Sequence, residues 1–129
     1  CNFPLEGLHP NAPTLAHASE CVAELAGNTA YWNFLSDLFV QAPINTFFDM
    51  TKLSATAVRA GAQAQTFATC MDSGKYRTKI EKEYADAVAA GGDGTPFNLI
   101  ITKSGATIAF PGAQPQANIE AAIEEALKN

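Results

Sequence analysis

A run of glycine and proline residues at positions 91–96 (GGDGTP) divides this sequence into two parts with different patterns. Before the run, apolar residues recur three and four positions apart, which is typical of amphipathic helices. After it, residues 97–102 (FNLIIT) predict a strand, residues 103–105 predict a turn, and residues 106–110 predict a second strand. A last helix is expected over residues 116–128. The pattern indicates a chain that is mostly helical and ends in a β-hairpin and a helix.

The part before the glycine run is expected to contain five helices that end near glycine or proline. Asn11 is a good N-cap residue, and Pro13 is tolerated in the first turn of the helix that follows. Pro4 and Pro10 make a helix unfavourable at the start of the chain, so residues 1–8 are expected to form a short strand. The expected helices cover residues 11–27, 30–42, 51–60, 63–72 and 75–90.

Composition places the chain among single-domain globular proteins. It has 129 residues, of which 47% are apolar and 16% are charged, so a core is expected and disorder is not. No apolar run is long enough to span a membrane. No signal segment is present, so any export signal is expected upstream of Cys1 or already removed. The net charge of −5 argues against nucleic-acid binding, which needs clustered Lys and Arg.

Three cysteines, Cys1, Cys21 and Cys70, bear on the compartment and the chemistry of the protein. No CxxC, CxxH or HExxH pattern is present, and an odd number leaves one cysteine unpaired if a disulfide forms. Two interpretations are open: three buried thiols, or one disulfide between two helices in an oxidising compartment. The cysteine count alone favours buried thiols.

Other candidate sites have simpler structural explanations. His9 and His17 are eight positions apart and have no flanking cysteine or carboxylate cluster, so no metal site is expected. The GGDG sequence at 91–94 follows a helix and precedes a strand, which is the reverse of a phosphate-binding loop. Cys1 and Pro4 (CNFP) look like a CxxC whose second cysteine is replaced, and Cys1 is interpreted as a cysteine at the end of a strand.

The dipeptide Thr95-Pro96 opens the best predicted strand. Because proline cannot donate a hydrogen bond to a sheet ladder, it indicates either an edge position or a cis peptide bond. The dipeptide alone leaves both open and favours the trans form, in which most such bonds occur.

The segment at 91–127 (GGDGTPFNLIITKSGATIAFPGAQPQANIEAAIEEAL) resembles the C-terminal end of DsbA-like proteins of the thioredoxin superfamily. In that family a G-T-P loop precedes a β-hairpin, and a GAQP-type loop precedes the final helix. Gly94-Thr95-Pro96 and residues 112–115 stand at those places. Three earlier segments also resemble parts of the family. NFPLEGLHPNA resembles the strand that leads into an inserted helical subdomain. ECVAELAGNTAYWNFLSDLF resembles the first helices of that subdomain, and FATCMDSGKY resembles its late helices.

The resemblance implies an α/β, thioredoxin-like fold with an inserted helical subdomain, and thiol–disulfide exchange through a mixed disulfide. It implies that Gly94, Thr95 and Pro96 form a cis-proline loop in which Thr95 offers its backbone to an extended substrate segment. It also implies a structural disulfide between Cys21 and Cys70. The implied substrates are thiols or disulfides of exported proteins, and a membrane redox partner is implied as well. The implied location is extracytoplasmic. No cofactor, metal or nucleic acid is expected.

The sequence departs from the family in one respect. The family's βαβ unit with the CxxC comes before the strand that NFPL resembles; this sequence has no counterpart, so no residue is assigned as catalytic. Without the strand leading to the CxxC, both of its neighbours in the sheet are expected to have unpaired edges. Three explanations are open: a fragment of a longer protein, a strand supplied by another chain, or a shortened, non-catalytic form with a rearranged sheet.

The first explanation is favoured, so residues 1–129 are expected to be a single, N-terminally truncated DsbA-like domain. Its expected parts are a strand at 1–8, a helical insertion with the following helix at 11–90, and a β-hairpin with the final helix at 95–129. The favoured function is disulfide oxidoreductase activity of the full-length protein, with this chain alone inactive. One alternative is a redox-inactive thioredoxin-fold module that binds extended peptides or a partner protein. An all-helical binding domain is a weaker alternative, because it leaves the GTP and GAQP loops unexplained.

Overall fold

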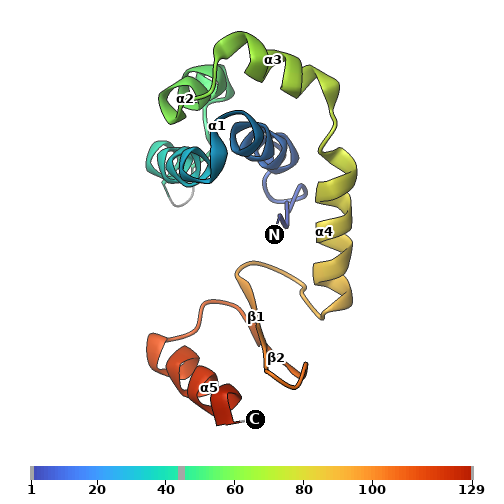
Figure 1. The fold of residues 1–129 in the computed structure, drawn as a ribbon. Helices are drawn as coiled ribbons and strands as arrows, with labels where there is room; N and C mark the ends of the chain where they lie inside the picture. The colour runs from blue at the N-terminus through green and yellow to red at the C-terminus, as the bar shows by residue number, and fades with distance from the viewer. Residues whose placement is uncertain (1, 44–45, 129) are drawn as a thin grey trace. The chain divides into compact units, whose positions relative to one another are not determined.

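The structure, a computed structural model, describes residues 2–43 and 46–128. It divides into two compact units, Cys1–Lys82 and Glu83–Asn129, and each is described here by itself. The elements are α1 (Ala12–Gln41), the short 3-10 helix η1 (Met50–Lys52), α2 (Leu53–Ala60), α3 (Ala64–Ser73), α4 (Arg77–Ala89), β1 (Phe97–Ile101), β2 (Thr107–Pro111) and α5 (Gln116–Lys128). Figure 1 labels all of them except η1.

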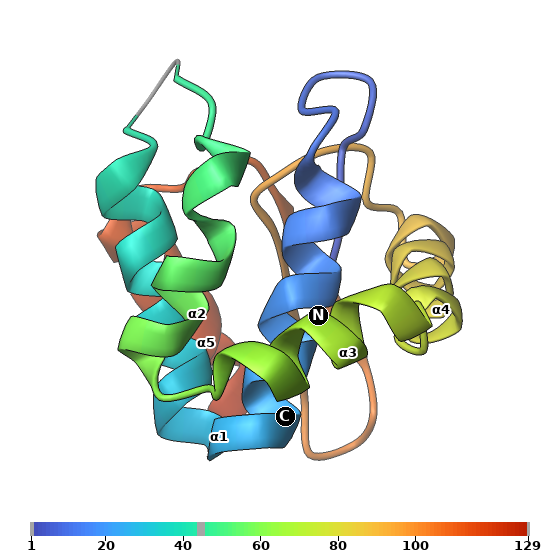
Figure 2. The same ribbon diagram turned by 90° about the horizontal axis from the view of Figure 1, so that it is seen from above.

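The first unit is helical, and α1 is broken within its length. Gly27 has φ 85° and ψ −179°, a backbone conformation that glycine adopts without a side-chain clash. The chain reverses direction there, so the two halves of α1 lie side by side (Figure 2). These halves are the two helices that the sequence predicts on either side of Gly27. At the N-terminus Asn11 is the N-cap as expected, but its side chain forms no capping hydrogen bond.

The core of the first unit lies where α2 and α3 contact the two halves of α1. Phe34, Val22 and Ala57 are fully buried there. Other buried apolar members are Ala18, Cys21, Ala30, Leu38, Phe48, Leu53, Ala62, Phe67 and Cys70. Because these side chains come from α1, α2, α3 and the segments between them, burial of apolar surface holds the helices together.

A buried hydroxyl group joins α2 to the second half of α1. Thr56 is fully buried, and its Oγ1 donates to the Lys52 carbonyl oxygen at 2.9 Å. The same Oγ1 accepts hydrogen bonds of 3.0 Å from Gln41 Nε2 and Arg59 Nη2. Arg59 also donates through Nε and Nη2 to Asp37 Oδ2, at 2.9 and 2.7 Å. This network fixes α2 against the second half of α1.

In the second unit, α4 ends where the glycine run begins. Gly91, with φ 94°, donates to the Val88 carbonyl, and Gly92 donates to the Ala87 carbonyl, both at 2.9 Å. This is the Schellman arrangement of a helix C-terminus. Gly92 is buried, and a Cβ there would lie 2.9 Å from the Ala87 oxygen and 3.1 Å from the Phe97 ring. The glycine run therefore allows the end of α4 to approach the first residue of β1 closely.

The strands β1 and β2 form an antiparallel hairpin, with Phe97 opposite Pro111 and Ile101 opposite Thr107. The predicted hairpin is thus present, with its strand ends shifted by one residue. Helix α5 contacts β1 and has the bounds that the sequence predicts. Ala126 is its buried residue.

The expected strand at the start of the chain does not form over residues 2–8. These residues are irregular and then turn, because the Leu5 carbonyl accepts hydrogen bonds from the backbone N–H groups of Leu8 (3.0 Å) and His9 (2.8 Å). A strand requires a paired neighbour, and among the described residues strand pairing is confined to β1 and β2. Residue 1, with the interpretation given to Cys1, lies outside the described residues. No helix in the described ranges has both the length and the apolar character to cross a membrane.

Candidate functional site

The Gly94-Thr95-Pro96 loop lies directly before β1. Its Thr95–Pro96 peptide bond is cis, and both residues are exposed, while Gly94 is half-buried. The Pro96 carbonyl accepts a 2.9 Å hydrogen bond from the Gly112 N–H, which extends the hairpin ladder beyond the ends of the strands. The loop is therefore anchored on its β2 side and accessible elsewhere.

The hydrogen-bond pattern of the hairpin determines which backbone groups face away from β2. Pro96 and Thr102 bond toward β2, at either end of β1. Directions alternate along an antiparallel strand, so Phe97, Leu99 and Ile101 point their N–H and C=O groups to the other side. No described residue of the second unit forms a hydrogen bond with the Thr95 backbone. This edge is able to accept another extended chain.

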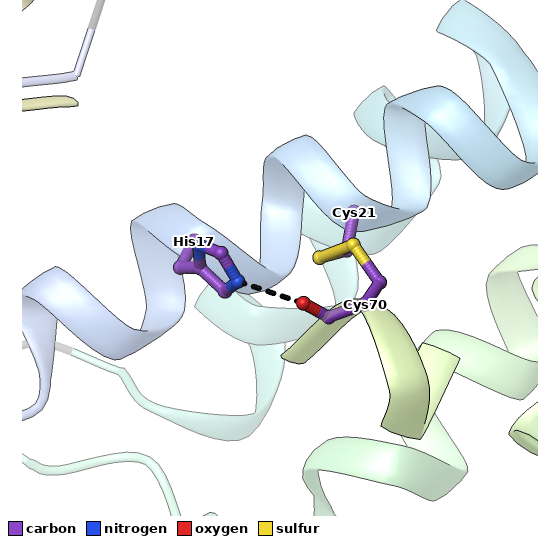
Figure 3. A group of neighbouring side chains, drawn as sticks. All are labelled: His17, Cys21 and Cys70. Carbon is purple, nitrogen blue, oxygen red and sulfur yellow. Dashed lines mark hydrogen bonds between the residues drawn. A yellow bond between two sulfur atoms is a disulfide. The ribbon is translucent and has the colours of Figure 1, made fainter. Parts of the chain in front are cut away.

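Cys21 and Cys70 form a disulfide that joins the first half of α1 to α3 (Figure 3). Their Sγ atoms are 2.05 Å apart and their Cα atoms 5.9 Å apart. Both residues are buried. The interpretation of these two residues as buried thiols, which the cysteine count favoured, is therefore wrong. Counting cannot reveal which helix faces meet, and here the two helices bring the cysteines together.

His17 lies beside this disulfide, one turn before Cys21 on α1 (Figure 3). It is buried, and its Nε2 is 3.2 Å from the Cys70 carbonyl oxygen. Because a carbonyl only accepts, Nε2 carries the proton in this hydrogen bond. The Tyr76 ring lies against the imidazole, with centroids 5.8 Å apart. From the sequence, His17 is expected to be an ordinary histidine. Its i, i+4 spacing from Cys21 is the sequence signal for their proximity.

Acidic side chains of α1 form ion pairs with lysines near the end of α3 and in α4. Lys75 pairs with Glu24, and Lys79 pairs with Glu20. Tyr76 also donates from its hydroxyl to Glu24 Oε2 at 2.9 Å. The hydrogen bonds from Lys75 and then Tyr76 lower the pKa of Glu24. Burial, followed by the hydrogen bond to Glu24, raises the pKa of Tyr76 to about 12. These contacts hold the chain after α3 onto α1, close to the disulfide.

The ligand-type atoms of His17, Cys21 and Cys70 lie within 4.8 Å of one another. While the disulfide is intact, neither sulfur is a thiolate, which is the form of cysteine that binds metals. His9 does not belong to this group; it is exposed and its ring approaches Phe47 edge-on, at 6.2 Å. The sequence does not connect His17 with Cys70, because the two residues are 53 positions apart.

A family model, described as the DSBA-like thioredoxin domain, matches residues 3–124. No curated protein and no solved structure matches the chain significantly. The family match spans both units, the cis Thr95–Pro96 bond and both bridged cysteines, and it covers nearly the whole sequence. The chain therefore belongs to the family of DSBA-like thioredoxin domains.

Proposed function

We propose that this chain is part of an extracytoplasmic thiol–disulfide oxidoreductase of the DsbA type that acts on exported proteins. The family match over residues 3–124 carries the proposal, because DsbA-like domains act on protein thiols and disulfides. The sequence contains no CxxC, and Cys21 and Cys70 are bonded to each other, so we assign the exchanging pair to a segment beyond these 129 residues. A membrane redox partner is proposed to restore that pair after each cycle.

In this proposal the loop Gly94-Thr95-Pro96 contacts the substrate. Thr95 is exposed, and its backbone groups have no hydrogen-bond partner among the described residues of the second unit. An extended substrate segment forms backbone hydrogen bonds with such an edge in the manner of an added strand. The rest of the open edge of β1 pairs with the strand that leads to the exchanging cysteines.

The Cys21–Cys70 disulfide has a structural role in this proposal. It is buried between α1 and α3, so a protein substrate does not reach its sulfur atoms in the folded chain. Disulfides persist in oxidising compartments, which supports the proposed extracytoplasmic location. The bond stabilises the helical unit while exchange takes place elsewhere.

The first test is the intact mass and peptide map of the protein as its host produces it, followed by an assay of oxidative refolding of a reduced protein that needs several disulfides. The proposal requires a CxxC-containing segment and refolding activity that its cysteine-to-serine variants lose. A protein whose mass is that of these 129 residues, without exchange activity, would contradict it.

The loop is tested in the same assay by Thr95→Pro, which removes the backbone N–H of residue 95, with Thr95→Val as the matched control that keeps it. Loss of one or two substrate hydrogen bonds, at about 1 kcal/mol each, predicts a kcat/KM about tenfold lower for Thr95→Pro. Thr95→Val is expected to stay within about twofold of the unmodified protein. Equal kcat/KM values for the two variants would show that the Thr95 N–H does not bind the substrate.

A redox-inactive module that binds extended peptides is the second candidate, and the exposed Thr95 beside the open edge of β1 supports it. It uses the same open edge without any exchange step. It predicts that Thr95→Pro weakens peptide binding in a protein that shows no oxidase or reductase activity.

A further inference from the structure

Four side chains with metal-binding atoms meet at the disulfide; we call them the disulfide cluster. His17, Cys21 and Glu24 follow one another at intervals of four and three residues, so they share one face of the first half of α1. Cys70 comes from the last turns of α3. All four belong to the first unit.

The distances in the disulfide cluster are close to those of a metal site. One ring nitrogen of His17 and the two sulfurs lie within 4.8 Å of one another. Glu24 Oε2 lies 3.9 Å from Cys70 Sγ. In a tetrahedral zinc site with Zn–S bonds of about 2.3 Å, two sulfurs lie about 3.8 Å apart. The Cα atoms of Cys21 and Cys70, 5.9 Å apart, can therefore keep their positions while the side chains rotate to separate the sulfurs.

We propose that reduction of the Cys21–Cys70 disulfide creates a binding site for one Zn²⁺ ion, with His17, Cys21 and Cys70 as ligands and Glu24 as the fourth. Two cysteines, a histidine and a carboxylate are ligands that Zn²⁺ binds in proteins. The oxidised chain has no such site, because a disulfide offers no thiolate. The same four residues thus form a covalent crosslink in one redox state and a metal site in the other.

The reaction balances with a dithiol as the reductant. The dithiol loses two electrons and two protons and becomes a disulfide, while the Cys21–Cys70 bond breaks and each sulfur gains one hydrogen. Zn²⁺ then replaces the two thiol protons, which leave to water. His17 binds through a neutral ring nitrogen, and the Glu24 carboxylate binds through an oxygen.

The charged side chains near the disulfide cluster favour binding of the ion. Two thiolates and one carboxylate leave the zinc complex with one negative charge, and Lys75 lies in contact with Glu24 at 2.5 Å. Lys79, paired with Glu20, lies in the first turn of α4, four residues after Lys75. The sulfurs and the imidazole are buried, whereas the Glu24 side chain is 42% exposed. Glu24 therefore marks the side from which an ion enters.

The test is a titration of the reduced chain with Co²⁺, a spectroscopic substitute for Zn²⁺ whose thiolate complexes show charge-transfer absorption. Cys1→Ser serves as the background, so that only Cys21 and Cys70 supply thiols. A phosphine reductant is used because it leaves no competing dithiol. The proposal expects one Co²⁺ per reduced chain, displaced by Zn²⁺, and none in the oxidised chain.

Matched variants identify the ligands. His17→Gln is expected to weaken Co²⁺ binding by at least about tenfold. Loss of a residue that only hydrogen-bonds to a metal ligand already lowers metal affinity by about 10–100-fold. His9→Gln is the control, because it removes the other histidine of the chain and leaves the cluster intact. The double variant Cys21→Ser/Cys70→Ser is expected to abolish the thiolate absorption.

Far-UV circular dichroism accompanies each titration. Native helix content in the metal-bound reduced chain supports the proposal, whether that content is retained on reduction or restored by the metal. The proposal is overturned if the reduced chain binds no Co²⁺, if His17→Gln binds as tightly as His9→Gln, or if reduction unfolds the chain and metal does not restore it.

Discussion

The Nε2 atom of His17 donates a hydrogen bond to the carbonyl oxygen of Cys70, 3.2 Å away, while Cys70 is bonded through sulfur to Cys21. α1 and α3 are thus joined twice at one place, by a covalent bond and by a hydrogen bond. Both bonds lie in the buried part of the first unit.

Replacing both bridged cysteines by alanine is expected to lower the free energy of unfolding substantially. The bond closes a loop with a sequence separation of 49 residues, and loop entropy at that length corresponds to about 4 kcal/mol. Urea unfolding of Cys21→Ala/Cys70→Ala against the oxidised protein measures the difference. The difference should largely disappear when both proteins are unfolded in the presence of a reductant. A double variant as stable as the oxidised protein would contradict the prediction.

Stability is expected to fall in acid partly through Glu24. Its pKa is lowered in the folded chain from 4.5, first by the hydrogen bond from Lys75 and then by that from Tyr76. A carboxyl group with a lowered pKa contributes stability above its unfolded value, and this contribution is lost as the pH falls through the folded pKa. Urea midpoints at about pH 7 and about pH 3 should therefore differ less in Glu24→Gln than in the unmodified protein.

Glu81→Gln on α4 is the control for this pH experiment, because Glu81 is an exposed acidic residue away from these contacts. It should leave the pH dependence unchanged. High salt should also reduce the effect of Glu24, since its partners are near the surface. If the urea midpoints of Glu24→Gln and Glu81→Gln depend on pH in the same way, Glu24 does not cause the loss of stability in acid.

Gly92→Ala is expected to destabilise the second unit. The added Cβ would meet the Ala87 carbonyl oxygen at 2.9 Å and the Phe97 ring at 3.1 Å, so the end of α4 or the start of β1 must shift. Such overpacking lowers the free energy of unfolding by about 1–3 kcal/mol. Gly94→Ala, with open space around its Cβ position, is expected to change stability by less than about 0.5 kcal/mol. Thermal unfolding of the two variants compares them directly.

Thr56→Val is expected to lower the free energy of unfolding by about 1–3 kcal/mol, because it leaves the polar partners of the hydroxyl without their hydrogen bonds. The buried hydroxyl donates to Lys52 and accepts from Gln41 and Arg59. Thr69→Val is the matched control: the same change at an exposed position, where the hydroxyl donates to the Gln65 carbonyl. Equal urea midpoints for the two variants would show that the buried network adds nothing.

Local signals in the sequence predicted most of the elements. The α5 bounds are those expected, since a loop with two prolines precedes it and its apolar residues recur at helical spacing. Gly27 and Gly91 marked helix ends because no other residue adopts their backbone conformations as easily. The first turn of the helix expected from residue 51 is a 3-10 helix, capped by the Asp49 side chain, which accepts from the Thr51 N–H.

What the sequence did not predict depends on contacts between distant residues. The strand expected at residues 2–8 needed a neighbour to pair with, and local pattern carries no information about that neighbour. His17 and Cys70 are 53 positions apart, so their contact arises only when α3 packs on α1. The resemblance to DsbA-like proteins implied the cysteine pairing, but it said nothing of the histidine beside it.

The break at Gly27 has a consequence for how the helical unit opens. The half of α1 before Gly27 is covalently attached to α3 through Cys21, whereas the half after it is attached to α2 through the side chains around Thr56. A local opening in one half does not need to pass through the other, because no helical hydrogen-bond ladder runs continuously across the glycine. In amide hydrogen exchange the two halves should therefore behave as separate cooperative units, and reduction of the disulfide should accelerate exchange more in the first half than in the second.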